Sequence, residues 1–204
     1  MAFPKSVEIL EVGARDGLQN EPGTIAAAVK VDFIDRLSKT GLKRIEFGAF
    51  VAPKVIPQMA DSNEVFAGIT QAPGVQYEAL VPNLRGFERA LAAGVKNILI
   101  FGAASESFSQ KNINCSIAES FERFAPVCEA AKANGIRVRG AVSCVLGCPY
   151  EGDISVDVIA DVADHVDVPV AAYHVSGEYA MVHAAGERGW IDAAAVALET
   201  LTAL

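Results

Sequence analysis

The first strand-like run of the chain ends in a group of side chains that could carry out chemistry. In the segment VEILEVGARDGLQNE, the apolar run is followed by Arg15, Asp16 and Gln19. Asp16 offers a hard oxygen ligand of the kind that Mg²⁺ or Mn²⁺ prefers. Arg15 offers a fixed cation that could stabilise a developing enolate. The alternative is that Arg15 and Asp16 only form a solvated turn between two glycines, because polar loop residues commonly face water.

The elements that would position these groups alternate between strand-like and helical patterns. This order is typical of a parallel sheet with crossover helices. Strands are expected at 7–12, 44–47, 75–81, 97–101, 137–143 and 168–174. Helices are expected at 25–40, 63–70, 84–93, 116–134, 157–164, 177–188 and 192–204. Ser116, with Glu119 three residues later, predicts a capping box at the start of one of them.

This order predicts an α/β fold of the (β/α) TIM-barrel type, with one domain over residues 1–204. A closed barrel of this type needs eight strands and about 250 residues. The sequence provides six strand patterns, so an incomplete barrel is expected. Open sheet edges expose unpaired backbone groups, so we expect a homo-oligomer in which a second copy covers them. Groups just past the carboxyl end of a barrel strand face the active-site mouth, where Arg15 and Asp16 would lie.

Composition restricts the partners of the chain. A formal charge of -8, a pI near 4.9 and the lack of a basic cluster predict no binding of nucleic acid. The longest apolar runs are strand-sized and shorter than the roughly 20 residues that span a bilayer, so no membrane segment is expected. The start, MAFPKSVEILEV, has the layout of neither a secretory signal nor a transit peptide. A cytoplasmic protein is therefore expected.

The four cysteines are too sparse for a disulfide scaffold. Cys144 and Cys148 are four residues apart with no second pair, which argues against zinc. Apolar residues lie within two positions of Cys115 and Cys144 on both sides, which favours small core residues over nucleophiles. Cys148 lies on an expected loop, in GCPYEG, and is slightly better placed to react.

Four further segments, each after or around an expected strand, extend the first motif. They are IEFGAFVAPKVIPQMAD, VPNLRGFERALAAGVK, IFGAASESFSQKNINCSIAESFERF and VRGAVSCVLGCPYEGDIS. Together they resemble successive segments of the hydroxymethylglutaryl-CoA lyases, which are relatives of the DRE-TIM metallolyases, over about residues 6–163. The resemblance implies a retro-aldol cleavage of 3-hydroxy-3-methylglutaryl-CoA to acetyl-CoA and acetoacetate. It also implies Mg²⁺ or Mn²⁺ as the cofactor and an acyl-CoA as the small-molecule partner.

The resemblance also implies roles for individual residues. Asp16 matches the metal-binding carboxylate, Arg15 the electrostatic catalyst, and Glu46 a strand carboxylate that helps to position the site. A bound metal would lower the pKa of the substrate hydroxyl and polarise the scissile bond. Glu46 could instead be the buried partner of a barrel arginine, for which Arg139 is a candidate.

Substrate contacts are expected from Gln19 and from the region that precedes the 116–134 helix. Its polar loop could contact an acyl-CoA or could simply be solvated; it carries Ser105, Ser107, Lys111, Asn112 and Asn114. Gln19, Asn112 and Ser116 are the residues in these segments that we expect to bind substrate.

After about residue 164 the pattern changes. The lyase family would continue with a His-x-His pair, a cysteine loop and an asparagine ligand, whereas His174 stands between Ala172 and Ser176. Residues 167–204 instead resemble porphobilinogen synthase, a (β/α)₈ enzyme, in which Ser176 matches a serine that binds a substrate carboxylate. His174 could restore part of the metal site, or could be a core or substrate-contact histidine.

Three functions are therefore open. The first is a lyase that is impaired by missing metal ligands. The second is a non-catalytic chimeric or engineered barrel scaffold, with lyase-like units over 1–163 and a porphobilinogen-synthase-like unit over 164–204. The third is a relative of porphobilinogen synthase, although the segments that carry the Schiff-base lysines of that enzyme are missing from the sequence.

Overall fold

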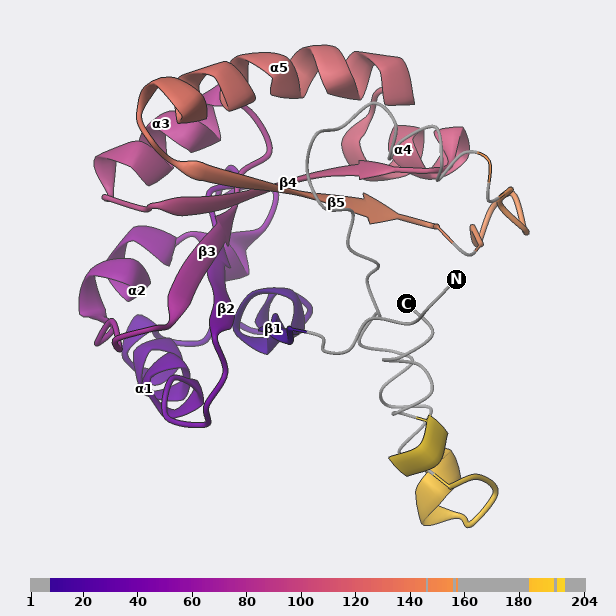
Figure 1. Cartoon of the computed structure of the whole chain (residues 1–204), viewed down its shortest axis with the longest axis horizontal. Coiled ribbons are helices and arrows are strands. Elements are labelled where there is room, and N and C mark those ends of the chain that lie inside the picture. Colours follow the sequence, from indigo (N-terminus) through magenta and orange to yellow (C-terminus); the bar gives the residue numbers. More distant parts are fainter. Residues whose placement is uncertain (1–7, 146, 156, 158–183, 193, 197–204) are drawn as a thin grey trace.

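Five parallel strands form one curved sheet in the order β1-β2-β3-β4-β5 (Figure 1). Each strand pairs in parallel with the next one along the chain, and parallel neighbours require a crossover connection. The computed structural model describes residues 8–145, 147–155, 157, 184–192 and 194–196. The strands are β1 (Leu10–Glu11), β2 (Arg44–Ala49), β3 (Gln76–Leu80), β4 (Asn97–Ala103) and β5 (Arg137–Ser143).

The crossovers carry helices that lie along the outer side of the curved sheet (Figure 1). These helices are α1 (Ala27–Leu37), α2 (Ser62–Gly68), α3 (Leu84–Ala92), α4 (Glu106–Ile113) and α5 (Ile117–Ala133). Two short turns accompany them: η1 (Gly13–Gly17), a turn of π-helix, and η2 (Pro57–Met59), a turn of 3₁₀-helix. In the described part of the chain, no helix combines the length and apolarity that a membrane crossing requires.

The hydrophobic core fills the space between the sheet and the helices. Successive side chains of a strand point to opposite faces, so Ile45 and Phe47 of β2 face the helices whereas Glu46 faces the inner side of the curve. Phe47 is 1% exposed and its ring stacks on Phe66 of α2, with 4.6 Å between the ring centroids. On α5, Val127 is fully buried in the same core. This packing holds the strands in the curve that places charged side chains on the inner side.

A buried serine joins the carboxyl end of β2 to α2. The Ser62 hydroxyl accepts a hydrogen bond from the backbone N–H of Ala49 at 3.1 Å, and its oxygen lies 2.9 Å from the carbonyl oxygen of the same residue. A Cβ atom on Gly48 would lie 2.7 Å from the Ser62 hydroxyl oxygen. Glycine at position 48 therefore allows the end of β2 to approach α2 closely.

The sequence predicted most of these elements. The fold class is confirmed, because the described strands form an open curved sheet of five strands where a closed barrel has eight. The strand predicted at 137–143 has the same bounds as β5, and β2 and β4 are each two residues longer than predicted. The strand predicted at 168–174 lies outside the described residues. So does the helix predicted at 157–164, apart from its first residue. Residues 184–187 and 194–196 are helical, within the helices predicted at 177–188 and 192–204.

The loop predicted around Asn112 is wrong, because residues 106–113 form helix α4. Its composition is polar and lacks a continuous apolar face, so periodicity gave little signal. Local capping instead defines the helix. The Ser105 side chain accepts a hydrogen bond from the N–H of Phe108, and Asn114 ends the helix in the left-handed conformation, with φ of 52°.

Replacing Phe47 tests the contribution of the core. Phe47→Ala should lower the free energy of unfolding by about 3–5 kcal/mol, because it removes a buried ring and leaves a cavity. Phe121→Ala is the matched control, since Phe121 on α5 is 50% exposed, and it should change stability by less than about 0.5 kcal/mol. Urea denaturation followed by circular dichroism measures both. Equal effects of the two substitutions would contradict this description of the core.

Candidate active site

The turn η1 presents Arg15 and Asp16 just beyond the carboxyl end of β1. The Val12 carbonyl accepts hydrogen bonds from the backbone N–H groups of Arg15, at 3.0 Å, and Asp16, at 2.7 Å. The N–H of Gly13 donates to the Glu11 carboxylate at 2.6 Å. A Cβ atom at position 13 would lie 2.7 Å from the same carboxylate oxygen, so a larger residue there would displace the Glu11 carboxylate from this hydrogen bond. Turns of π-helix are frequent at functional sites.

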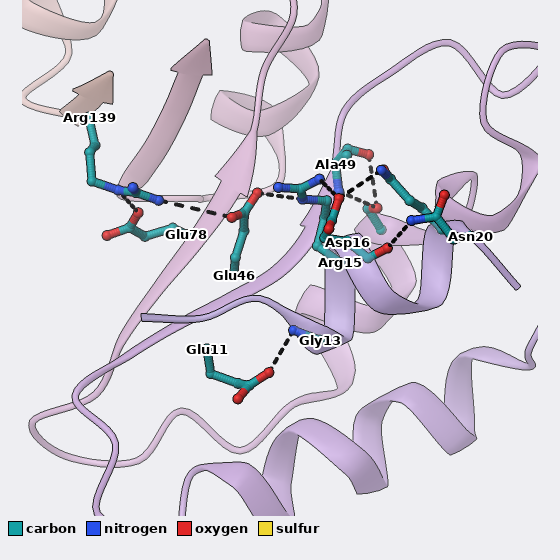
Figure 2. A network of polar contacts seen from close by, with 11 residues as sticks. Glu11, Gly13, Arg15, Asp16, Asn20, Glu46, Ala49, Glu78 and Arg139 are labelled. Atoms are coloured by element: carbon teal, nitrogen blue, oxygen red, sulfur yellow. Dashed lines mark hydrogen bonds and ion pairs between the residues drawn. The ribbon is translucent and has the colours of Figure 1, made fainter. Parts of the chain in front are cut away.

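Arg15 lies between two carboxylates (Figure 2). Its Nε donates to Glu46 Oε1 at 2.7 Å, and its Nη1 donates to Asp16 Oδ1 at 2.8 Å. The Arg15 side chain is 8% exposed and the Glu46 side chain 1%. Hydrogen bonds between charged groups are short and strong, so these two contacts fix the guanidinium plane. The alternative of a merely solvated turn is therefore wrong for Arg15.

Asp16 is held on its other side by Gln19. The Gln19 amide donates to Asp16 Oδ1 at 3.0 Å, and the Asn20 amide donates to the Asp16 carbonyl at 2.7 Å. The Asp16 side chain is 16% exposed, twice the fraction of Arg15. Asp16 therefore forms the more accessible end of the arrangement, while its carboxylate remains oriented by two side-chain donors.

Behind Arg15, two buried acids lie side by side on neighbouring strands. Glu46 of β2 and Glu78 of β3 are register partners. Arg139 of β5 donates from Nε to Glu78 Oε2 at 2.9 Å, and its Nη2 lies 4.0 Å from Glu46 Oε2. Arg44 donates from Nε to Glu78 Oε1 at 2.8 Å. We call this series the ionic chain: Asp16, Arg15, Glu46, Arg139, Glu78 and Arg44.

The alternation of charge in the ionic chain offsets the cost of burying it. An isolated buried carboxylate is expensive, whereas a paired and hydrogen-bonded one is tolerated. Glu46 is compensated incompletely: within the described residues, its Oε2 atom and the Arg139 Nη2 atom have no hydrogen-bond partner. Burial raises the pKa of the Glu46 carboxyl, the nearby positive charge of Arg15 opposes this shift, and the negative charge of Glu78 adds to it.

The structure brings together four residues that the sequence singled out: Arg15, Asp16, Gln19 and Glu46. Glu46 is also the buried partner of a barrel arginine, as the alternative reading held. Its closer partner is Arg15, whose Nε lies 2.7 Å from Glu46, whereas Arg139 Nη2 lies 4.0 Å from Glu46. Arg139 is instead hydrogen-bonded to Glu78. Sequence reasoning missed Glu78 and Arg44. Glu78 lies within the strand pattern at 75–81 and Arg44 within the one at 44–47. A charged residue inside an otherwise apolar strand pattern was the signal that could have identified both.

The other expected site residues lie away from these contacts or outside the described part. Asn112 is exposed on α4. Ser116 caps α5, and the predicted capping box with Glu119 is confirmed. His174 and Ser176 fall outside the described residues.

The donor set can be compared with the needs of a divalent ion. Mg²⁺ and Mn²⁺ sites are built from several oxygen or nitrogen ligands. The described residues contain no group of three or more His, Cys, Asp and Glu side chains that could hold a metal. Asp16 fits one ligand position, as an oriented and partly exposed carboxylate. Asp16 alone does not complete such a site, so a bound ion would need further ligands.

The raised pKa of Glu46 predicts a specific pH dependence of stability. The folded protein binds the Glu46 proton more tightly than the unfolded chain, whose ordinary glutamate pKa is 4.5. The stabilising contribution of the protonated form is complete below that value and is lost as pH rises through the raised pKa. Glu46→Gln cannot titrate, so its free energy of unfolding should rise relative to that of the parent protein over this pH range. Urea denaturation at a series of pH values measures the difference, and a difference that stays constant would contradict the assignment.

Two family models match the chain. The model described as HMGL-like matches residues 6–176. The model described as delta-aminolevulinic acid dehydratase matches residues 151–204. The two matches overlap, and the first covers most of the described structure, including the whole ionic chain.

Individual relatives agree with the first of these models. The 3-hydroxy-3-isohexenylglutaryl-CoA/hydroxy-methylglutaryl-CoA lyase of Pseudomonas aeruginosa is 57% identical over 176 residues, which are 86% of this chain and 58% of that protein. The mitochondrial hydroxymethylglutaryl-CoA lyase of Gallus gallus is 59% identical over 162 residues, which are 79% of this chain and 54% of that protein. The chain thus spans somewhat more than half the length of these relatives.

Solved structures of such lyases share the fold. The crystal structure of hydroxymethylglutaryl-CoA lyase from Pseudomonas aeruginosa superposes with a TM-score of 0.80 at 53% identity, over 88% of this chain and 63% of that chain. An HMG-CoA lyase from Acinetobacter baumannii, in complex with coenzyme A and 3-methylmalate, gives a TM-score of 0.75 at 37% identity, over 81% of this chain and 54% of that chain. Because a family model matches residues 6–176 and because the fold and most of the sequence are similar to those of these proteins, the chain belongs to the HMGL-like family.

Proposed function

We propose that the protein is a divalent-metal-dependent lyase that cleaves 3-hydroxy-3-methylglutaryl-CoA to acetyl-CoA and acetoacetate. The observation that carries this proposal is the buried guanidinium of Arg15, fixed between Glu46 and Asp16 at the carboxyl end of β1. The names of the similar proteins, which are hydroxymethylglutaryl-CoA lyases, support the choice of substrate. An acyl-CoA is thus the proposed small-molecule partner.

The proposed reaction needs a cation at the place where negative charge develops. When the bond between C2 and C3 of the substrate breaks, the C3 hydroxyl loses its proton to a base and becomes the carbonyl of acetoacetate. The electron pair of the broken bond forms the enolate of acetyl-CoA, which then takes up a proton at C2. Arg15 is permanently charged, and fixed donors stabilise a developing oxyanion without reorganising. In this proposal Glu46 orients Arg15 from β2, and Asp16 orients it from η1.

The remaining roles follow the sequence interpretation. Asp16 and His174 are the proposed metal ligands, and a bound Mg²⁺ or Mn²⁺ would lower the pKa of the substrate hydroxyl. Gln19, Asn112, Ser116 and Ser176 are the proposed substrate contacts. We propose that turnover is slow, because His174 lacks the second histidine of a His-x-His pair and affinity for a divalent ion depends on several fixed ligands.

A chimeric scaffold without turnover is the second candidate. The observation that favours it is the match of residues 151–204 to the dehydratase model. In this reading, the units over 1–163 and 164–204 have different origins, and the ionic chain serves the stability of the sheet alone. Absence of acetoacetate from wild-type protein at every Mg²⁺ and Mn²⁺ concentration would favour this candidate over the lyase.

Substitution of Arg15 tests the lyase proposal. Arg15→Lys keeps the charge but cannot reproduce the two fixed contacts, and Arg15→Met removes the charge. Arg15→Met should lower kcat by about 10²–10³-fold, as the loss of an oxyanion donor does, and Arg15→Lys should retain part of the activity. Release of acetoacetate from 3-hydroxy-3-methylglutaryl-CoA with Mg²⁺ measures both.

The matched control is Arg36→Met on α1, because the Arg36 side chain is 75% exposed and its ion pair among the described residues is with Asp32 on the same helix. It should leave kcat unchanged. Circular dichroism of each variant separates loss of activity from loss of folding. A folded Arg15→Met protein with the parent's kcat would refute the role of Arg15.

A further inference from the structure

Beyond the ionic chain, residues 147–152 form a loop that folds back against the start of α4. We call it the thiol loop. Cys148 and Gly152 exchange two backbone hydrogen bonds across it, at 2.7 and 2.8 Å. The Glu151 carboxylate accepts a hydrogen bond from the N–H of Ser107 at 2.7 Å. Lys111 Nζ lies 3.5 Å from the centre of the Tyr150 ring. These contacts hold the loop in a defined position.

The thiol of Cys148 lies inside this loop among hydrogen-bond donors. Cys148 is 6% exposed. The Ser105 hydroxyl donates a hydrogen bond to the Cys148 sulfur at 2.9 Å, and the backbone N–H of Tyr150 donates to the same sulfur at 3.4 Å. The Ser105 oxygen also accepts the N–H of Phe108 at the start of α4, which polarises its hydroxyl group towards donation. Such an environment favours a thiolate.

The electrostatic consequence agrees with this geometry. Burial acts to raise the pKa of Cys148, but the hydrogen bonds from Ser105, from the backbone N–H groups of Tyr150 and Glu151, and from Cys144 outweigh it, so the pKa lies below its usual value. Burial and the neighbouring Cys148 and Glu151 raise the pKa of Cys144 to about 11. Of the two thiols, Cys148 is therefore the one whose surroundings favour the thiolate.

Cys144 is held beside Cys148 by an unusual backbone conformation. It follows directly after β5 and has a φ of 62°, in the left-handed region that residues other than glycine rarely adopt. Its thiol is hydrogen-bonded to that of Cys148. A strained conformation of this kind persists only where the surrounding structure enforces it, and it is common at functional sites.

We propose that Cys144 and Cys148 form an oxidation-sensitive dithiol that a hydroperoxide converts to a disulfide. The Cys148 sulfur attacks one peroxide oxygen, the O–O bond breaks, and the departing alkoxide or hydroxide takes up a proton, which leaves Cys148 as a sulfenic acid. The Cys144 sulfur then attacks Cys148, the S–O bond breaks, and the hydroxyl group leaves as water with the proton of Cys144. The dithiol thereby loses two electrons and two protons to the hydroperoxide, and a thiol reductant reverses the change.

The disulfide would alter the contacts of α4. A sulfur bonded to Cys144 no longer accepts the Ser105 hydrogen bond as a thiolate does, so the thiol loop loses one of its attachments to the helix. Helix α4 carries Asn112, a proposed substrate contact, so an effect on turnover rests on the proposed lyase function. Formation of the disulfide itself does not depend on that function.

Differential alkylation of the full chain tests the proposal without any substrate. Protein treated with hydrogen peroxide is denatured, its free thiols are blocked with iodoacetamide, its disulfides are reduced, and the released thiols are labelled with N-ethylmaleimide. Mass spectrometry should find the second label on Cys144 and Cys148 and the first on Cys115 and Cys128. Labelling of all four cysteines with N-ethylmaleimide to the same extent, or of neither Cys144 nor Cys148, would overturn the proposal.

Single variants separate the two roles. Cys144→Ser should stop the reaction at the sulfenic acid of Cys148, which dimedone traps, whereas Cys148→Ser should leave Cys144 as a thiol. Ser105→Ala should slow the oxidation of Cys148 several-fold, and Ser109→Ala is its matched control, because Ser109 on α4 donates to the Cys115 carbonyl. If Cys144 in the Cys148→Ser variant were oxidised at the rate of the parent protein, the assignment of Cys148 as the nucleophile would be wrong. An equal rate in Ser105→Ala and the parent protein would remove Ser105 from the mechanism.

Discussion

The burial of the Glu46 carboxylate is the constraint on which the rest of the site depends. Glu46 lies on the inner side of the curved sheet, beside Glu78, and both side chains are 1% exposed. Two adjacent buried acids repel each other and lose their hydration, so cations have to reach them. Arg139 comes from β5, and Arg15 comes from the turn after β1. The contact of Arg15 with Glu46 therefore ties the turn η1 to the buried charge of the sheet.

This constraint connects the interior of the sheet with the chemistry at its edge. Arg15 uses Nε to neutralise Glu46 and Nη1 to orient Asp16, so the same guanidinium serves stability and the proposed catalysis. Binding groups held by rigid strands are positioned more accurately than groups on free loops. The thiol loop is organised differently: helix caps and backbone hydrogen bonds hold it, and no buried ion pair in its described residues ties it to the sheet.

The parts of the fold that follow from local pattern could be predicted from the sequence. β5 was predicted with its observed bounds because apolar residues alternate along it between a glycine turn and a loop, and α5 was predicted because its capping box and apolar face agree. Helix α4 was missed, since its formation depends on the Ser105 cap instead of on periodicity. The pairing of Arg15 with Glu46 joins residues 31 positions apart, which only the register of the strands determines. Arg15 and Asp16 were singled out by their place directly after the first strand and Glu46 by the resemblance to a family, whereas Glu78 was singled out by neither.

The ionic chain contains three acidic and three basic side chains in alternation, and this balance limits how the sequence can change over evolutionary time. Loss of any one member removes an opposite charge from the side chain beside it, so effects of substitutions within the chain are not additive. A second replacement of opposite sign can restore the balance. Drift in this part of the barrel should therefore proceed through coupled pairs, and related sequences should show covariation of Glu78 with Arg139 where either has changed.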